Sequence, residues 1–188
     1  VATVALFTRK RIGDVTSIAL DLSSRTSVAL TRILAAAHWR IAPAFMASEP
    51  DLDAMLARAD AALVIGDPAF DIDPAKHGVT KIDLGGEWKA MTGLPFVYAM
   101  WVGRPSAATA EQCRQLQQAR DGGVAHLADI ARNVSGGDRE LERRSFHYLR
   151  DNLKFSLGDR EAAGLRRFHE LAAEIGLVPA RQPLRFFR

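Results

Sequence analysis

Cysteine is nearly absent from this sequence, and its scarcity excludes disulfide-stabilised proteins and proteins with a cysteine-based metal site. The 188 residues include a single cysteine, Cys113, so the chain has neither an internal disulfide framework nor a cysteine-based metal site. The histidines do not stand at the spacings of metal ligands either, which indicates surface or packing roles and predicts no metal. They are His38, His77, His126, His147 and His169. A lone reduced thiol fits a cytoplasmic protein.

Long apolar runs and a strong excess of one charge are also missing. No stretch is apolar for long enough to span a bilayer, and no signal-peptide hydrophobic region is present. Lys and Arg number 25 against 22 Asp and Glu, a formal net charge of +3, and the excess is spread along the chain. Even the basic run 139–150 is interleaved with acids, which is typical of a solvated helix face. We therefore expect neither a membrane nor a nucleic acid as partner.

What is present is the composition of an ordinary globular domain. The chain is 48% hydrophobic and 25% charged, which is enough to bury one sizeable core. It begins at Val1, without a methionine, directly in an apolar run. Since natural chains rarely begin within a strand, we expect a further segment to precede Val1 in the gene product.

The first hundred residues alternate between strand and helix patterns. Short runs rich in apolar and β-branched residues predict strands at 1–7, 17–22, 41–47, 61–65, 81–84 and 96–102. Apolar residues at helical spacing predict helices between them, at 26–37, 51–59 and 87–91. This alternation predicts an α/β fold with a parallel or mixed sheet and helices on its faces.

After Arg104 the pattern is helical throughout. Helices are predicted at 109–121 and 124–134, separated by Gly122 and Gly123, and again at 139–153 and 160–175. Asp159 suits the start of the last helix and Gly176 its end. The chain therefore divides into an α/β part, residues 1–103, and a helical part, residues 104–188, whose apolar stripes must be buried against another surface.

Five polar residues follow the predicted strand 17–22 and lead directly into a helix. They are Ser23, Ser24, Arg25, Thr26 and Ser27, and we call them the hydroxyl cluster. The free N–H groups of a first helical turn, the positive end of the helix dipole and nearby hydroxyls can together hold a carboxylate or a phosphate. A simpler role is that Ser23 or Ser24 caps the helix while Arg25 faces solvent. The pattern alone leaves both roles open.

A second candidate segment follows the predicted strand 61–65 and consists of Gly66, Asp67 and Pro68. Glycine allows a ligand or another backbone to approach closely, and Asp-Pro forces a turn. Ligands of open α/β sheets bind beyond the carboxyl ends of the strands. Because this segment and the hydroxyl cluster both follow strands, they are candidates to line one cleft. The alternative is a turn with no further role.

The third segment is DLGGEWKAMTGLPFVYAMW, residues 83–101. It resembles the DLG-x-EW-(x)3-TGLPFV signature shared by the chorismate dehydratases and the dihydroxynaphthoate synthases of the futalosine route to menaquinone. The sequences SSRTS, GDPA and YLRDNLKFSLGDREAAGLRRFHELAAEIGL resemble the dehydratase branch in the same order, so the resemblance covers nearly the whole chain. Gly86 departs from the signature, in which glutamate is usual at that position.

Within that group the resemblance favours the dehydratases. The synthases carry a histidine after the buried strand, where this chain has residues 66–68 without one. The resemblance implies a cytoplasmic hydro-lyase that converts chorismate, a dianion, to 3-[(1-carboxyvinyl)oxy]benzoate and water with no cofactor or metal. The hydroxyl cluster would hold a carboxylate, and residues 66–68 with Thr92 and Gly93 would shape the cleft. No residue is assigned as the general base.

The implied fold is the class II periplasmic-binding-protein-like fold, in which two α/β lobes are joined by hinge strands. Residues 1–103 would form the second lobe with hinge strands at 1–7 and 96–102, and residues 104–188 would return to a first lobe that is incomplete in this chain. We expect residues 1–188 alone to be inactive and to self-associate, and a homo-oligomer is left open. A non-catalytic solute-binding protein on the same scaffold is the alternative function.

Overall fold

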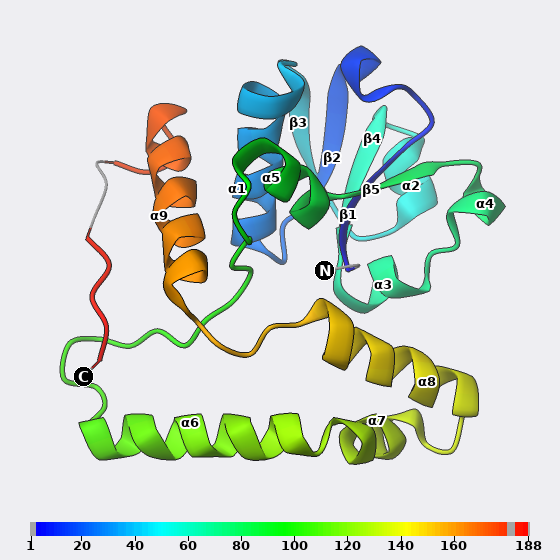
Figure 1. Cartoon of the computed structure of the whole chain (residues 1–188). Helices are drawn as coiled ribbons and strands as arrows, with labels where there is room; N and C mark the ends of the chain where they lie inside the picture. Colours follow the sequence, from blue (N-terminus) through cyan, green and yellow to red (C-terminus); the bar gives the residue numbers. More distant parts are fainter. Residues whose placement is uncertain (1–2, 180–182, 188) are drawn as a thin grey trace. The chain divides into compact units, whose positions relative to one another are not determined.

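The computed structural model describes residues 3–179 and 183–187 (Figure 1). The contacts between residues divide them into two compact units. The α/β unit extends to Tyr98 and resumes at Asp159, whereas the helical unit holds residues from Ala99 to Gly158 and from Pro183 onward.

The α/β unit is built on a five-stranded mixed sheet with the order β3-β2-β4-β1-β5 (Figure 1). Its strands are β1 Val4–Thr8, β2 Ser17–Asp21, β3 Ala44–Ser48, β4 Ala61–Ile65 and β5 Thr80–Asp83. β2 runs parallel to β3 and β4, whereas β1 is antiparallel to both β4 and β5. Four strands therefore end at the same side of the sheet, which we call the carboxyl edge. The predicted mixed α/β fold is confirmed.

Apolar side chains lie on both faces of the central strands. Successive residues of a strand point to opposite faces, so Leu6 and Leu63 enter one buried cluster while Phe7 and Val64 enter another. Each of these four side chains is fully buried. This double burial explains why β1 and β4 appear in the sequence as continuous apolar runs rather than as alternating ones.

Helices cover the two faces of the sheet. On one face lie α1 Arg25–Ile33, its continuation η2 Leu34–Trp39 and α5 Leu84–Thr92. On the other lie α2 Leu52–Leu56 and α3 Gly66–Asp71. The connections include two short helices, η1 Ile12–Asp14 and α4 Pro74–His77.

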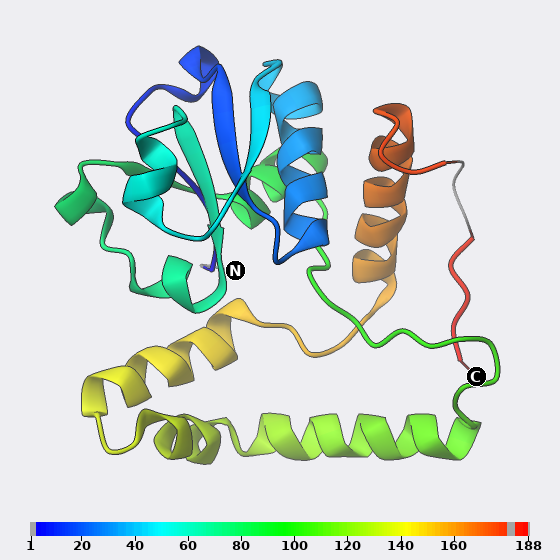
Figure 2. The ribbon, with the colours of Figure 1, turned by 180° about the vertical axis from the view of Figure 1, so that it is seen from behind.

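The last helix, α9 Asp159–Glu174, packs on α1. In Figures 1 and 2, α1 lies between the sheet and α9. Leu171 and Ala172 of α9 are buried in the same core as the sheet, with Phe168 and Ile175 packed against it. The apolar stripe of this helix is therefore buried within the α/β unit. Gly176, with φ of 73°, stops the helical conformation two residues after α9, as expected.

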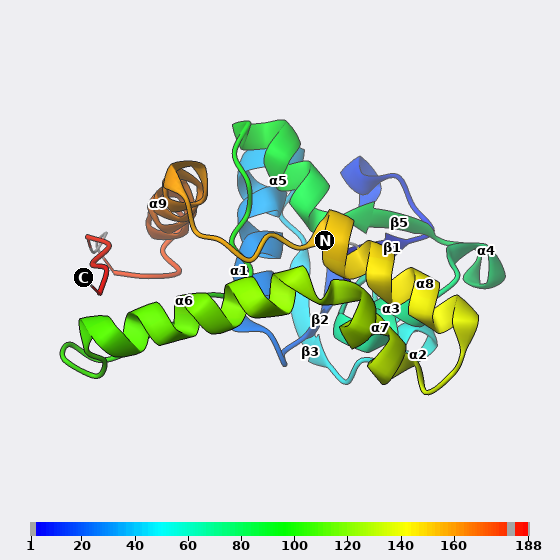
Figure 3. The same cartoon turned by 60° about the horizontal axis from the view of Figure 1, so that its bottom comes forward.

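The helical unit contains α6 Ala110–Ala125, α7 Leu127–Ser135, α8 Arg139–His147 and its continuation η3 Tyr148–Asn152. α7 and α8 pack side by side (Figure 3). Among the described residues, no helix combines the length and the apolar character that crossing a membrane requires.

One predicted strand is wrong, because residues 94–104 form neither strand nor helix. The ring of Phe96 packs edge-to-face on Trp88, with 5.3 Å between ring centroids, and on Phe168, at 5.2 Å. Phe96 and Tyr98, two of the aromatic residues that suggested a strand, are half-buried and pack on each other with 4.7 Å between ring centroids, without a hydrogen-bonded ladder to a neighbouring strand. The third, Trp101, is exposed.

Two helix boundaries also differ from the prediction, and both involve paired glycines. α6 continues through Gly122 and Gly123, since a glycine costs only about 1 kcal/mol relative to alanine within a helix. A capping box between Thr109 and Gln112 stabilises the start of this helix. α5 begins at Leu84 and includes Gly85 and Gly86, because Asp83 caps it by accepting a hydrogen bond from the Gly85 amide.

Candidate functional site

The hydroxyl cluster and residues 66–68 leave neighbouring strands at the same edge of the sheet. The cluster follows β2 and Gly66 follows β4. These two strands are parallel, with Leu20 opposite Leu63, so both connections lie at the carboxyl edge, at the lower end of the sheet in Figure 1. The topology thus meets the first requirement for a shared site.

The start of α1 is organised by serine side chains. Ser24 is the N-cap, and its Oγ accepts a hydrogen bond from the Ser27 amide at 3.2 Å and lies 2.9 Å from the Ser27 Oγ. The preceding residue, Ser23, donates its amide to Oδ1 of Asp21 at 2.9 Å. The capping role is therefore confirmed for Ser24, and Ser27 is buried as its partner.

Capping leaves part of the first turn available for a ligand. The amides of Arg25 and Thr26 have no acceptor among the described residues, because the cap engages the amide of Ser27. The Arg25 side chain is exposed and that of Thr26 is half-buried. Free amides, the positive end of the helix and a guanidinium are the groups that hold carboxylates in proteins.

Arg25 and Thr26 line a cavity of about 490 Å³ between α1 and the end of α9, which we call the α1–α9 cavity. Its volume lies in the range typical of small-molecule sites, roughly 300–1,000 Å³. The remaining wall is apolar except for a second arginine, and consists of Leu22, Val28, Ala29, Arg32, Phe168, Ala172, Leu177 and Val178. Two cations, one hydroxyl and an apolar wall suit an organic anion.

Residues 66–68 lie near the carboxyl edge but outside the wall of this cavity. Gly66 adopts a left-handed φ of 68° and donates its amide to the Thr3 carbonyl at 2.8 Å. Asp67 and Pro68 are exposed in the first turn of α3. The predicted turn is therefore the start of a short helix.

Thr92 and Gly93 do not line the α1–α9 cavity. They lie at the C-terminal end of α5, whose Glu87 accepts a hydrogen bond from Trp39 of η2 at 2.7 Å, so α5 lies beside the end of the α1–η2 helix. Thr92 Oγ1 donates to the Trp88 carbonyl at 2.8 Å. The Gly93 carbonyl accepts from Arg160 at 2.9 Å. In this structure their hydrogen bonds end the helix and attach it to α9.

Sequence reasoning missed two polar residues of this region. Arg32 stands seven residues after Arg25, and this spacing places both on one face of a helix, so the signal was present in the sequence. Asp21 is buried, and its carboxylate orients Ser23. An aspartate whose carboxylate accepts a hydrogen bond from the backbone amide two residues further on is typical of a turn, and the sequence Asp21-Leu22-Ser23 has this spacing. In the described part of the chain, no group of three His, Cys, Asp or Glu residues stands together to hold a metal.

Comparisons with known proteins add a biochemical context to this geometry. A family model described as menaquinone biosynthesis matches residues 1–174. A chorismate dehydratase of Thermus thermophilus is 28% identical over 194 residues, and the match covers 90% of this chain and 68% of that protein.

Proposed function

The chain belongs to the menaquinone biosynthesis family, and from this premise we propose that it is a chorismate dehydratase, which converts chorismate to 3-[(1-carboxyvinyl)oxy]benzoate and water. The observation that carries the proposal is the position of Arg25 and Thr26, on the wall of a cavity at a helix N-terminus. An organic anion is the ligand this arrangement favours. The family and the named Thermus relative narrow that anion to chorismate.

The proposed chemistry requires little more than positioning and charge neutralisation. Chorismate carries two carboxylates, and loss of a ring proton and of the ring hydroxyl leaves an aromatic ring, which favours the reaction. In this proposal the Arg25 guanidinium and the amides of Arg25 and Thr26 hold one carboxylate, with Ser23 beside them. Ser24 and Ser27 act indirectly, by holding the first turn in place.

The proton acceptor is the part of the mechanism that the α1–α9 cavity does not supply. None of the residues that line it is an acid or a histidine. The proposal therefore assigns proton removal to a carboxylate of the substrate or to a group from another part of the protein. Residues 66–68, Thr92 and Gly93, which do not line the α1–α9 cavity, are retained only as cleft-shaping residues.

We also propose a cytoplasmic protein with the class II periplasmic-binding-protein-like fold, in which residues 1–103 form the second lobe. Residues 104–188 return to the first lobe except for α9, which is buried in the core of the α/β unit. The supporting feature is β1, which lies antiparallel between β4 and β5 in an otherwise parallel sheet. An antiparallel strand at this position is what a chain entering from another lobe would contribute. The same fold also serves binding proteins, so turnover and not binding tests the function.

The test is an assay of the full-length gene product with chorismate, followed by chromatography of the product. Arg25→Met and Thr26→Val should raise KM, because a charge-assisted or hydroxyl contact contributes about 1.5–3 kcal/mol at most. That loss corresponds to a rise of up to roughly 10- to 150-fold in KM for Arg25→Met, with a smaller rise for Thr26→Val.

The matched control is Arg166→Met, which removes an exposed arginine of α9 that does not line the cavity. Its KM should equal that of the wild type. If the wild-type protein binds chorismate but does not convert it, the dehydratase proposal is wrong and the protein is a solute-binding protein. If KM is unchanged in both Arg25→Met and Thr26→Val, the hydroxyl cluster only caps the helix and does not bind the substrate.

A further inference from the structure

Arg32 has no acidic partner among the described residues, and one of its donors is unused. Its guanidinium carbon lies 4.8 Å from the centroid of the Phe45 ring. Its Nε is buried and has no hydrogen-bond acceptor. A buried N–H without an acceptor is unfavourable and rare in folded proteins. Because no acceptor holds the guanidinium in this orientation, a bound anion can recruit it by rotation about its side-chain torsions.

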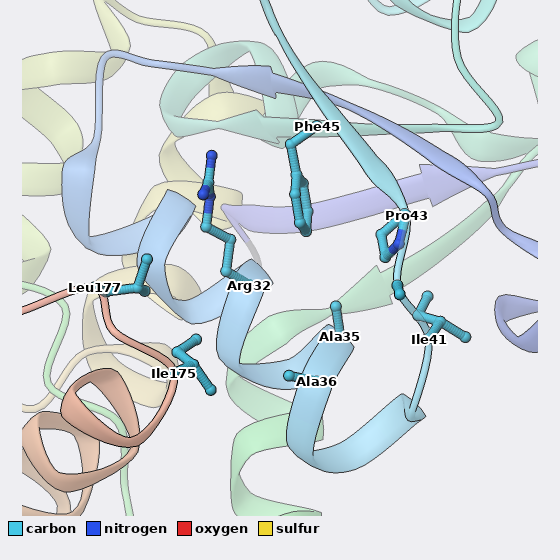
Figure 4. Close-up of a pocket in the computed structure, with 9 residues that line it drawn as sticks. Arg32, Ala35, Ala36, Ile41, Pro43, Phe45, Ile175 and Leu177 are labelled. Carbon is cyan, nitrogen blue, oxygen red and sulfur yellow. The ribbon is translucent and has the colours of Figure 1, made fainter.

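A second cavity of about 310 Å³ lies beside this arginine, and we call it the Phe45 cavity. Figure 4 shows Arg32 and Phe45 next to each other, with Ile41 and Pro43 on one side and residues of the α9 end on the other. The complete lining is Arg32, Ala35, Ala36, Ile41, Ala42, Pro43, Phe45, Ile175 and Leu177. Arg32 is the one charged residue in this wall, and every other member is apolar.

We propose that the Phe45 cavity is a binding site for a small carboxylate that carries a single planar ring. The planar guanidinium matches a carboxylate with two parallel hydrogen bonds, and the wall holds no acid that would repel it. The aliphatic lining and the Phe45 ring provide the apolar surface that a ring requires. A phosphate would leave most of this wall unused. This site does not depend on the proposed function, since it is separate from the α1–α9 cavity except for the shared Arg32 and Leu177.

Benzoate is the probe for this site, and benzamide is its uncharged counterpart. In ligand-observed NMR titrations, benzoate should bind at least tenfold more tightly than benzamide. Arg32→Met should weaken benzoate binding at least tenfold, because it removes the charge and keeps the length of the chain. Ala36→Leu should weaken it by a similar factor, because it fills the cavity without touching the arginine.

Ala37→Leu is the matched control, since Ala37 is the exposed neighbour of Ala36 and does not line the cavity. It should change benzoate affinity less than twofold. The proposal is overturned if benzoate shows no saturable binding, if benzamide binds equally well, or if Ala36→Leu has no effect. Loss of binding in Arg25→Met with full binding in Ala36→Leu would also overturn it, by placing the ligand in the α1–α9 cavity.

Discussion

Asp60 joins three segments of the α/β unit through a single side chain. Its Oδ2 accepts hydrogen bonds from the Thr16 amide at 2.9 Å and from the Thr16 hydroxyl at 2.8 Å. Its Oδ1 pairs with Lys10 Nζ at 2.6 Å. The hydrogen bond from Lys10, followed by those from Thr16, holds the pKa of Asp60 well below its ordinary value of 3.8. At the residue scale, this carboxylate fixes the connection into β4.

Asp60→Asn keeps the shape of the side chain and removes its charge. We expect the free energy of unfolding at pH 7 to fall by about 1–2 kcal/mol. Because the pKa is lowered in the folded state, the contribution is present well above pH 3.8 and is lost as the pH falls below that value toward the folded pKa. The stabilities of wild type and variant should therefore converge in acid, as urea unfolding at a series of pH values would measure.

Asp14→Asn is the control for this comparison, since Asp14 is exposed in η1 and its substitution should have little effect at any pH. A difference between wild type and Asp60→Asn that stays constant down to acid pH would contradict the role of the charge.

At the scale of the element, glycine has opposite roles in α9 and α6. A Cβ on Gly164 of α9 would overlap the carbonyl oxygen of Pro95, so the absence of a side chain allows the helix to approach the 94–98 segment. A Cβ on Gly122 of α6 would meet nothing within 4 Å. Only the first glycine is required by packing.

The same substitution should therefore have opposite signs in the two helices. Gly164→Ala should destabilise the protein by about 1–3 kcal/mol, because a backbone oxygen cannot move aside as a side chain can. Gly122→Ala should stabilise it by up to about 1 kcal/mol, because alanine is the better helix former. Chemical unfolding of both variants measures the changes in the free energy of unfolding. If both changes have the same sign, the close approach of α9 to the Pro95 carbonyl does not determine the effect of the substitution.

At the scale of the whole α/β unit, three aromatic rings connect segments that are far apart in the sequence. Trp88 of α5 lies 5.3 Å from Phe96 and 6.3 Å from Phe168 of α9, measured between ring centroids. Trp88 is fully buried, and within the described structure its indole N–H has no hydrogen-bond acceptor. Ring packing, without a hydrogen bond from the indole, therefore holds Trp88 at this junction.

Phe168→Ala should lower the free energy of unfolding by about 2–4 kcal/mol, because it removes the ring contacts with Trp88 and Phe96 and leaves a void beside Trp88. Phe155→Ala, at a side chain that is 42% exposed, should change it by about 0.5 kcal/mol or less. Urea unfolding gives both values, and hydrogen exchange should show the amides of α9 opening before those of β1 and β4. Equal losses in the two variants would contradict the role of this cluster.

Elements with a local physical cause could be predicted from the sequence. The buried strands β1 and β4 appear as continuous apolar runs. β2 ends one residue before its predicted end, and β5 is shifted by one residue from its predicted bounds. Ser24 caps α1, and Gly176 ends the region after α9, because these roles depend on one or two neighbouring residues. The mixed α/β fold could be predicted from the alternation of strand and helix patterns in the first hundred residues. The family could be predicted from short motifs, because each motif can be recognised from a few consecutive residues.

Only the tertiary structure decided which of these elements meet. The apolar stretch 96–102 suggested a strand, but its sequence does not say which of its residues will be covered. Here the ring of Phe96 packs on Trp88 and Phe168, whereas Trp101 and Val102 are exposed. In the sequence only its spacing from Arg25 distinguished Arg32 from other helix residues, whereas in the structure it lies beside Phe45 and the residues that follow α9. Thr92 and Gly93 lie in the segment that resembles the family signature, yet the Gly93 carbonyl accepts a hydrogen bond from Arg160 and neither residue lines the α1–α9 cavity. Contacts between distant residues depend on how all the apolar surfaces are buried together, and no single segment carries that information.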